Sequence, residues 1–138
     1  MPSRPNVEDY EEFFEGSDLI TLHGYLRILP AEICRKYTQI YNGHPALISH
    51  YPELKGLDKQ EDVWFHKDKY PYIGSVIHQC TEELDAGQIL YACQRENNVV
   101  SLDDAYLKLR TTSLRTWLEF FSDLNNQGLQ VYTKLFQL

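Results

Sequence analysis

A short segment over residues 38–42, which contains Ile40 and Tyr41, stops at a glycine and a His-Pro step, in the order Asn42-Gly43-His44-Pro45. Runs of this length that end at a chain breaker are typical of strands in a parallel sheet. We therefore predict a strand over 38–42 that turns at its end and presents Asn42 and His44 there. Open α/β sheets bind their ligands outside the carboxyl ends of the strands, so this turn is the first candidate for a site.

Helices and strands alternate on both sides of this segment. Apolar residues at helical spacing predict a helix beginning at Pro30 and further helices over 7–15, 59–67 and 102–124. Runs rich in β-forming residues predict strands over 18–23, 72–80 and 88–94. Residues 129–138 either add an edge strand or pack down on the fold. The order α-β-α-β-α-β-β-α predicts one α/β domain over 1–138, with a loose arm over 1–6.

Polar residues stand where three of these helices should begin. Asn6 is suited to cap the first helix and Asp58 the one over 59–67. Ser101 and Asp104 have the spacing of a capping box, with Asp in place of Glu. These positions therefore support the predicted helix starts.

Charge and cysteine usage exclude several classes of protein. The net charge is −7 and no more than two basic residues are adjacent, which argues against nucleic acid or an anionic membrane as a partner. No apolar stretch approaches the ~20 residues that span a bilayer, and the N-terminus opens no apolar run. Three cysteines without a CxxC pair are typical of reduced thiols. We therefore expect a cytoplasmic protein.

Asn42 and His44 are two side chains that can bind an oxyanion together. An amide N–H and an imidazole can both donate to the negative oxygen that forms when a carbonyl is attacked. The alternative is a purely structural role, in which Asn42 caps the turn and His44 is a surface histidine before a proline. The Asn-x-His spacing alone leaves both interpretations open.

Asp85 is a candidate partner for an imidazole, because it lies in the acidic loop 81–87 between two predicted strands. A carboxylate there can fix the tautomer of a histidine, raise its pKa, or accept a proton. The alternative is a solvated loop acid. The histidines and cysteines form no recognisable zinc pattern, so no metal site is predicted.

Four segments in this order resemble a known family. They are residues 24–29 (GYLRIL), 42–47 (NGHPAL), Tyr51-Pro52, and His78 followed by the loop 81–87 (TEELDAG). The chain is similar to the folate-dependent formyltransferases, most of all the glycinamide ribonucleotide formyltransferases. The resemblance implies a truncated doubly wound, Rossmann-like fold with a mixed, mostly parallel sheet and flanking helices. It also implies a transferase that moves a formyl group from 10-formyltetrahydrofolate, its co-substrate, to a small amine.

The same resemblance assigns roles to individual residues. It makes Asn42, His44 and Asp85 catalytic, with Asp85 also in the folate cleft. The folate would lie between Arg27, Ile28 and Leu29 on one side and Thr81 and Glu82 on the other. The acceptor would contact Gly24 and Leu26. His78 matches a family histidine before the loop, although a core histidine remains the alternative.

Two departures from the family pattern concern the acceptor. The N-terminal half with its phosphate loop has no counterpart, and neither GxGxxG nor GxxxxGK[ST] occurs. Ser113 stands near the place where the family has a glutamate that contacts the ribonucleotide. We therefore expect another acceptor or a second chain that completes the site. A missing half would also leave a strand edge open, so we expect a homo-oligomer.

Two alternative functions remain at this point. The chain can be a folate-binding or interaction module without catalysis, because the phosphate-binding half is missing. It can also be a 10-formyltetrahydrofolate hydrolase, in which water takes the place of the amine.

Overall fold

The computed structural model describes residues 2–23, 25, 27–56, 59–83, 86–126 and 134–138. One sheet holds five strands in chain order: β1 (Ile20–His23), β2 (Ile40–His44), β3 (Tyr72–Gln79), β4 (Ile89–Glu96) and β5 (Lys134–Gln137). The β1–β2 and β4–β5 pairs are parallel, and β3 is antiparallel to both of its neighbours. Four strands therefore run one way and β3 runs against them, which confirms the predicted mixed, mostly parallel sheet.

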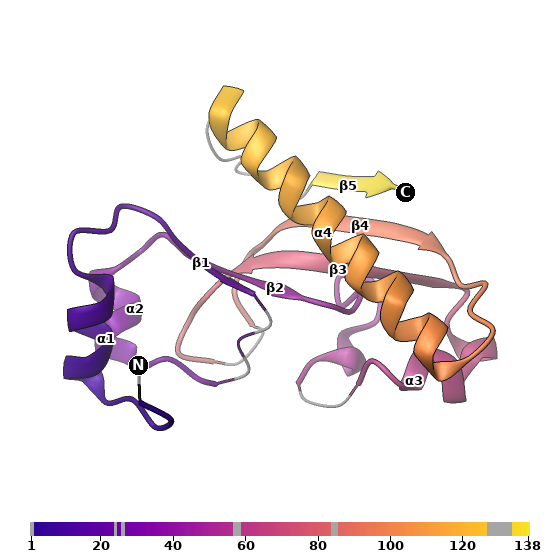
Figure 1. The fold of residues 1–138 in the computed structure, drawn as a ribbon, viewed down its shortest axis with the longest axis horizontal. Coiled ribbons are helices and arrows are strands. Elements are labelled where there is room, and N and C mark those ends of the chain that lie inside the picture. Colours follow the sequence, from indigo (N-terminus) through magenta and orange to yellow (C-terminus); the bar gives the residue numbers. More distant parts are fainter. Residues whose placement is uncertain (1, 24, 26, 57–58, 84–85, 127–133) are drawn as a thin grey trace.

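Helices cover both faces of this sheet (Figure 1). They are α1 (Val7–Phe14), α2 (Ala31–Lys36), α3 (Asp62–Phe65) and α4 (Leu102–Asn126), with short 3-10 turns at η1 (Pro52–Leu54) and η2 (Lys67–Lys69). The long helix α4 crosses one face alone, while α1 and α2 pack at the β1 end of the molecule. The unit β1–α2–β2 joins two parallel neighbours, as the sequence predicted.

Two of the predicted helix caps are confirmed. The backbone N–H of Asp9 donates to Oδ1 of Asn6 at 2.9 Å, and the N–H of Asn6 donates back to the Asp9 carboxylate at 2.8 Å. At α4, the N–H of Asp104 donates to the Ser101 hydroxyl at 3.0 Å. These bonds satisfy N–H groups that a helix start leaves without an intrahelical partner. The proposed cap Asp58 lies outside the described residues.

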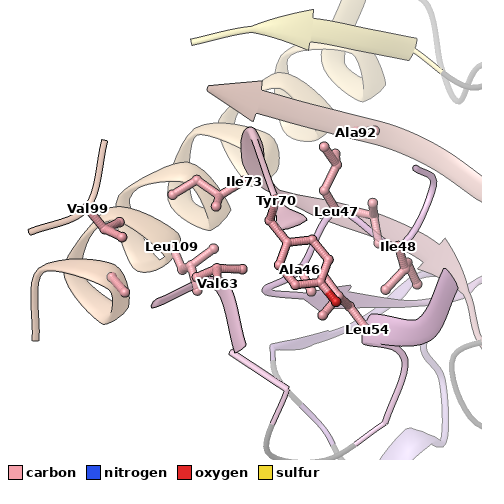
Figure 2. Close-up of a cluster of buried hydrophobic side chains, with 12 residues drawn as sticks. Ala46, Leu47, Ile48, Leu54, Val63, Tyr70, Ile73, Ala92, Val99 and Leu109 are labelled. Atoms are coloured by element: carbon pink, nitrogen blue, oxygen red, sulfur yellow. The ribbon is translucent and has the colours of Figure 1, made fainter. Parts of the chain in front are cut away.

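Apolar side chains pack between the sheet and the segment that follows β2. Figure 2 shows Ala46, Leu47 and Leu54 beside the ring of Tyr70. Leu47 and Leu54 are each 1% exposed. Burial of such a side chain contributes roughly 1.5–3 kcal/mol. This cluster therefore fixes the path of the chain directly after His44.

The strand β2 continues further than the sequence predicted. It was expected to end at Asn42, but Gly43 and His44 stay in the sheet, opposite Ile77 and Val76 of β3. The prediction was wrong because the antiparallel strand β3 pairs with both residues. This pairing outweighs the tendency of Gly43 and the His-Pro step to end a strand. The turn follows at Pro45.

The predicted helix over 59–67 is also corrected. Only α3 is helical, and His66 leaves helical geometry with φ −123° and ψ 44° before η2 begins. The side chain of Lys67 then donates to the carbonyl of Val99 at 2.6 Å, which ties this turn to the start of α4.

Residues 134–137 form the edge strand that was one of two predicted outcomes. No helix in the described ranges has the length and apolar character needed to cross a membrane.

Candidate active site

Asn42 and His44 lie on the same side of β2, because side chains two residues apart on a strand share a face. Both are 4% exposed. Gly43 between them faces α4, where a Cβ atom would lie 2.6 Å from the indole nitrogen of Trp117. Glycine is therefore required here by the close packing of Trp117. The structure thus brings the two predicted residues side by side in a buried position.

The amide of Asn42 is held in one orientation by the loop after β1. Its Nδ2 donates to the carbonyl of Tyr25 at 2.8 Å, and its Oδ1 accepts from the N–H of Tyr25 at 3.2 Å. A primary amide carries two N–H groups, so one donor remains after these bonds. The hydroxyl of Tyr25 is in turn hydrogen-bonded to the hydroxyl of Tyr10 on α1.

The ring of His44 is held by η1. Its Nε2 lies 3.0 Å from the carbonyl of Leu54. A carbonyl only accepts, so Nε2 carries the proton of this bond and a second proton on the ring would sit on Nδ1. The backbone carbonyl of His44 accepts from the hydroxyl of Ser75 at 3.1 Å. Both the ring and the backbone of His44 are therefore fixed in place.

A narrow cleft lies beside Asn42. It is lined by His78, which sits opposite Asn42 in the β2–β3 ladder, and by Arg27, Ile28, Leu29 and Thr81. Its volume is about 20 Å³, far below the roughly 300 Å³ at the lower end for ligand pockets. The structure therefore brings four predicted folate-binding residues together, around a space that is narrow as it stands.

The backbone of this cleft has groups available for a ligand. Among the described residues, Arg27 and Ile28 make no backbone hydrogen bond, and both residues are exposed. Across the cleft, the Thr81 hydroxyl is occupied by bonds to the backbone of Glu83. Glu83 lines the cleft, whereas the predicted Glu82 is exposed and is not part of its wall. The other predicted residues Gly24, Leu26 and Asp85 lie outside the described residues.

A larger hollow opens on the α4 side of the β1 and β2 ends. It measures about 300 Å³, and its walls include His23, Gly43, Pro45, Gln60, Tyr106 and Arg110. An adjoining hollow of about 130 Å³ reaches His44 itself and shares Pro45, Gln60 and Tyr106 with the first. The end of β2 therefore separates two spaces, a narrow cleft at Asn42 and a wider hollow whose adjoining part reaches His44.

Of the α4 residues that line this hollow, Ser113 was indicated by the sequence, whereas Tyr106 and Arg110 were not. Tyr106, Arg110 and Ser113 follow one another at helical spacing and all line it. That spacing was visible beside the apolar stripe of the helix and would have indicated a polar face directed at a site. In the described part of the chain, no three His, Cys, Asp or Glu residues are grouped so that they could hold a metal ion.

A family model described as formyl transferase matches residues 6–112. Phosphoribosylglycinamide formyltransferase of Dictyostelium discoideum is 34% identical over 83 residues, which are 56% of this chain and 40% of that protein. The matched segment therefore spans less than half the length of that relative.

Two solved structures show a similar fold. Phosphoribosylglycinamide formyltransferase of Streptococcus pneumoniae TIGR4 is 25% identical with a TM-score of 0.72, over 90% of this chain and 71% of that one. A formyltransferase from Anoxybacillus kamchatkensis, solved in complex with UDP-4,6-dideoxy-4-formamido-L-AltNAc and tetrahydrofolate, is 21% identical with a TM-score of 0.69, over 97% and 71%. At this low identity, the second likeness speaks for the fold alone.

Proposed function

This chain belongs to the formyl transferase family, and from that premise we propose that it is an enzyme that transfers the formyl group of 10-formyltetrahydrofolate to an amine of a small molecule. The observation that carries the proposal is the position of Asn42 and His44. They stand buried between the narrow cleft at Arg27 and Thr81 and the wider hollow on the α4 side, so each of two reactants has a space beside them. A transferase needs both reactants to meet at one carbonyl.

The proposed reaction proceeds by addition and elimination. The acceptor nitrogen attacks the formyl carbon, a C–N bond forms, and the carbonyl electrons move onto oxygen. The remaining N–H of Asn42 and a protonated His44 donate to this oxyanion. When the oxyanion collapses, the bond to the folate nitrogen breaks and that nitrogen takes up the proton that the amine loses. Donors fixed before reaction typically lower such barriers by several kcal/mol.

Asp85 completes the proposed set through the family resemblance. A carboxylate beside the His44 ring would favour its charged form and relay the proton through an ordered water. The family resemblance is also the basis on which we propose that Gly24 and Leu26 contact the acceptor.

The folate itself would bind in the cleft beside Asn42. The unused backbone groups of Arg27 and Ile28 suit the donor and acceptor edge of a pterin, and Leu29 and Thr81 supply the walls. Because the cleft holds only about 20 Å³, binding requires the loop at Thr81 and Glu82 to separate from the Arg27 loop. The tetrahydrofolate named for the Anoxybacillus kamchatkensis formyltransferase supports this choice of co-substrate.

The protein is proposed to self-associate and to work in the cytoplasm. In the described part of the chain β1 pairs only with β2, so its outer edge offers unpaired backbone groups. Exposed edges of this kind favour pairing with a further strand. No cysteine is part of a disulfide, which suits a reducing compartment.

A transfer assay tests the proposal directly. The chain is incubated with 10-formyltetrahydrofolate and a panel of amines, and both tetrahydrofolate and formylated amine are measured. We expect amine-dependent product that is lost in His44→Gln and retained in His50→Gln, a matched change at an exposed histidine. Folate binding by calorimetry without product from any amine would instead support the non-catalytic module. Formate release without amine would support the hydrolase.

A further inference from the structure

We propose that two copies of this chain associate through the outward face of α4, with the two helices antiparallel about a two-fold axis. The contact surface is a line of residues on α4, called the outer stripe: Leu107, Thr111, Leu114, Leu118 and Phe121. This surface is distinct from the open edge of β1 named above, and its role does not depend on formyl transfer.

The outer stripe is exposed although it is apolar. Leu107, Leu114 and Leu118 are 58%, 62% and 53% exposed, and Phe121 is 42% exposed. The hydroxyl of Thr111 donates to the carbonyl of Leu107 at 2.9 Å, so the helix satisfies this donor and it does not interrupt the stripe. Apolar side chains in such a continuous line on a surface typically mark a contact with another protein.

The opposite face of α4 already packs on the sheet. Leu109, Trp117 and Phe120 are buried there. A surface helix of a globular protein normally has one apolar face, turned toward the core, and a polar face toward solvent. A helix with a second apolar face is therefore expected to be covered on both sides.

The spacing of the outer stripe is that of a seam between two helices. Its positions from 107 to 121 alternate by four and three residues, which is the repeat of coiled-coil seams. At 1.5 Å per residue the stripe is about 21 Å long, or about four turns. Because α4 crosses its face of the sheet alone (Figure 1), a second helix can lie along it without displacing another helix of this chain.

The charge on this surface favours a second copy over a charged partner. None of the five stripe residues is charged. The charges at its flanks are paired within the chain, Lys108 with Asp104 at 2.8 Å and Arg115 with Glu119 at 3.6 Å. An acidic or basic peptide would find little to pair with there. An identical stripe matches this surface, because two-fold dimers use the same patch on both copies.

The order of charges along α4 favours the antiparallel arrangement. From residue 107 onward, Lys108, Arg110 and Arg115 come first, and Glu119 and Asp123 follow. Antiparallel helices place the basic part of one copy beside the acidic part of the other, whereas parallel helices place like charges together. Their dipoles also oppose each other.

The stripe is centred on Leu114. Leu107 lies seven residues before it and Phe121 seven residues after it. A two-fold axis close to Leu114 therefore brings Leu107 of each copy to the level of Phe121 of the other. All of the exposed apolar side chains of the stripe are then covered.

The size and charge of the interface set how strong the dimer should be. One helix pair lies at the lower end of interface sizes, below about 1,200 Å², so we expect a dissociation constant on the order of 10 μM. Each copy carries a net charge of −7, so the copies repel. Salt screens this repulsion, and the dimer should be several-fold tighter in about 0.5 M than in about 0.05 M NaCl. A partner of opposite charge would be weakened instead.

Charge substitutions within the stripe test the surface by sedimentation velocity. Leu114→Glu/Leu118→Glu and Leu114→Lys/Leu118→Lys should each raise the dissociation constant at least about 100-fold, because like charges then face each other. An equimolar mixture of the two variants should restore the dimer to within about 10-fold of the original affinity. This restoration also requires that both variants are folded. Leu135→Glu, at an exposed leucine on β5, is the matched control and should change nothing.

Cross-linking tests the antiparallel arrangement. Leu114→Cys should form a disulfide between copies under mild oxidation. Leu107→Cys should not, because its counterpart would lie about 21 Å away along the axis. The unsubstituted chain, whose three cysteines are free, is the control. Equal cross-linking of both variants overturns the antiparallel arrangement.

The remaining outcomes separate this surface from self-association as such. A dimer that none of the charge variants weakens overturns the outer stripe and keeps self-association through another surface, such as the β1 edge. A chain that stays monomeric up to about 500 μM, well above the expected dissociation constant, overturns both. Either result leaves formyl transfer to its own assay.

Discussion

Tyr25 and Asn42 are joined by two hydrogen bonds that run in opposite directions between one backbone and one side-chain amide. This pairing fixes which end of the Asn42 side chain carries the oxygen and which the nitrogen. A flipped amide would place its N–H group against the N–H of Tyr25 and its oxygen against the carbonyl of Tyr25. The loop after β1 therefore determines which way the remaining Asn42 donor points. Tyr10 extends the same chain of contacts into α1.

Asn42→Asp should abolish most of the transfer activity. The carboxylate loses the N–H that bonds to the carbonyl of Tyr25 and the N–H proposed to face the oxyanion, and it adds a negative charge beside it. We expect kcat to fall by roughly 10²- to 10³-fold, the size seen when one oxyanion donor is removed. Steady-state kinetics measure this, with Asn125→Asp at the exposed end of α4 as control. An unchanged kcat would contradict the role given to Asn42.

Tyr10→Phe should weaken the hold on Tyr25 without touching the reacting groups. Loss of the hydroxyl pair should lower the free energy of unfolding by about 1 kcal/mol and reduce kcat several-fold with the KM for folate unchanged. Burial raises the pKa of Tyr10, and the hydrogen bond to Tyr25 raises it further. Its hydroxyl should therefore stay protonated when exposed tyrosines ionise, which an ultraviolet pH titration reports. Tyr72→Phe on an exposed side chain is the matched control.

Gly43→Ala should distort the end of β2. The added methyl would lie 2.6 Å from the indole nitrogen of Trp117, so either the ring or the strand must move. Overpacking of this kind typically costs about 1–3 kcal/mol, and thermal unfolding measures it. Trp117→Leu in the same chain should relieve part of the clash. If the double variant is no more stable than the sum of the single changes predicts, Trp117 is not the cause.

Cys93 should resist thiol reagents in the folded protein. Burial raises the pKa of its thiol to about 11, with Arg115 opposing the shift. At pH 8 only about one molecule in a thousand would then carry the reactive thiolate. Labelling with a disulfide reagent, followed by peptide mass mapping, should find Cys93 modified only after denaturant is added. Prompt modification in native buffer would show that β4 opens more readily than its burial implies.

The parts of the fold that follow from local pattern were predictable. Apolar residues between chain breakers indicated β1, α2 and β2, because the spacing of those residues and the breakers beside them are local features of the sequence. The extension of β2 to His44 was not predictable in this way, since β3 supplies the pairing from more than thirty residues away. The same holds for the turn after the short α3, where the side chain of Lys67 donates to the carbonyl of Val99, which is 32 residues away.

Two threonines in α4 are buried although nothing in the sequence indicated it. Thr112 and Thr116 are fully buried, which their polarity argues against. Each hydroxyl donates to the carbonyl four residues earlier, so the helix itself satisfies them and they pack as small apolar groups.

The pair Asn42 and His44 was visible in the sequence because a strand fixes the direction of alternate side chains. The hollow was not, because Arg110 and Pro45 meet only through the packing of α4 on the sheet.

Trp117 lies directly on the backbone of Gly43 and against the ring of His23. The chain has only one other tryptophan, Trp64. A Trp64→Phe variant would therefore give a single intrinsic fluorophore, which lies against two residues that line the hollow, Gly43 and His23. Its emission would follow the occupancy of that space in real time, before any product is made.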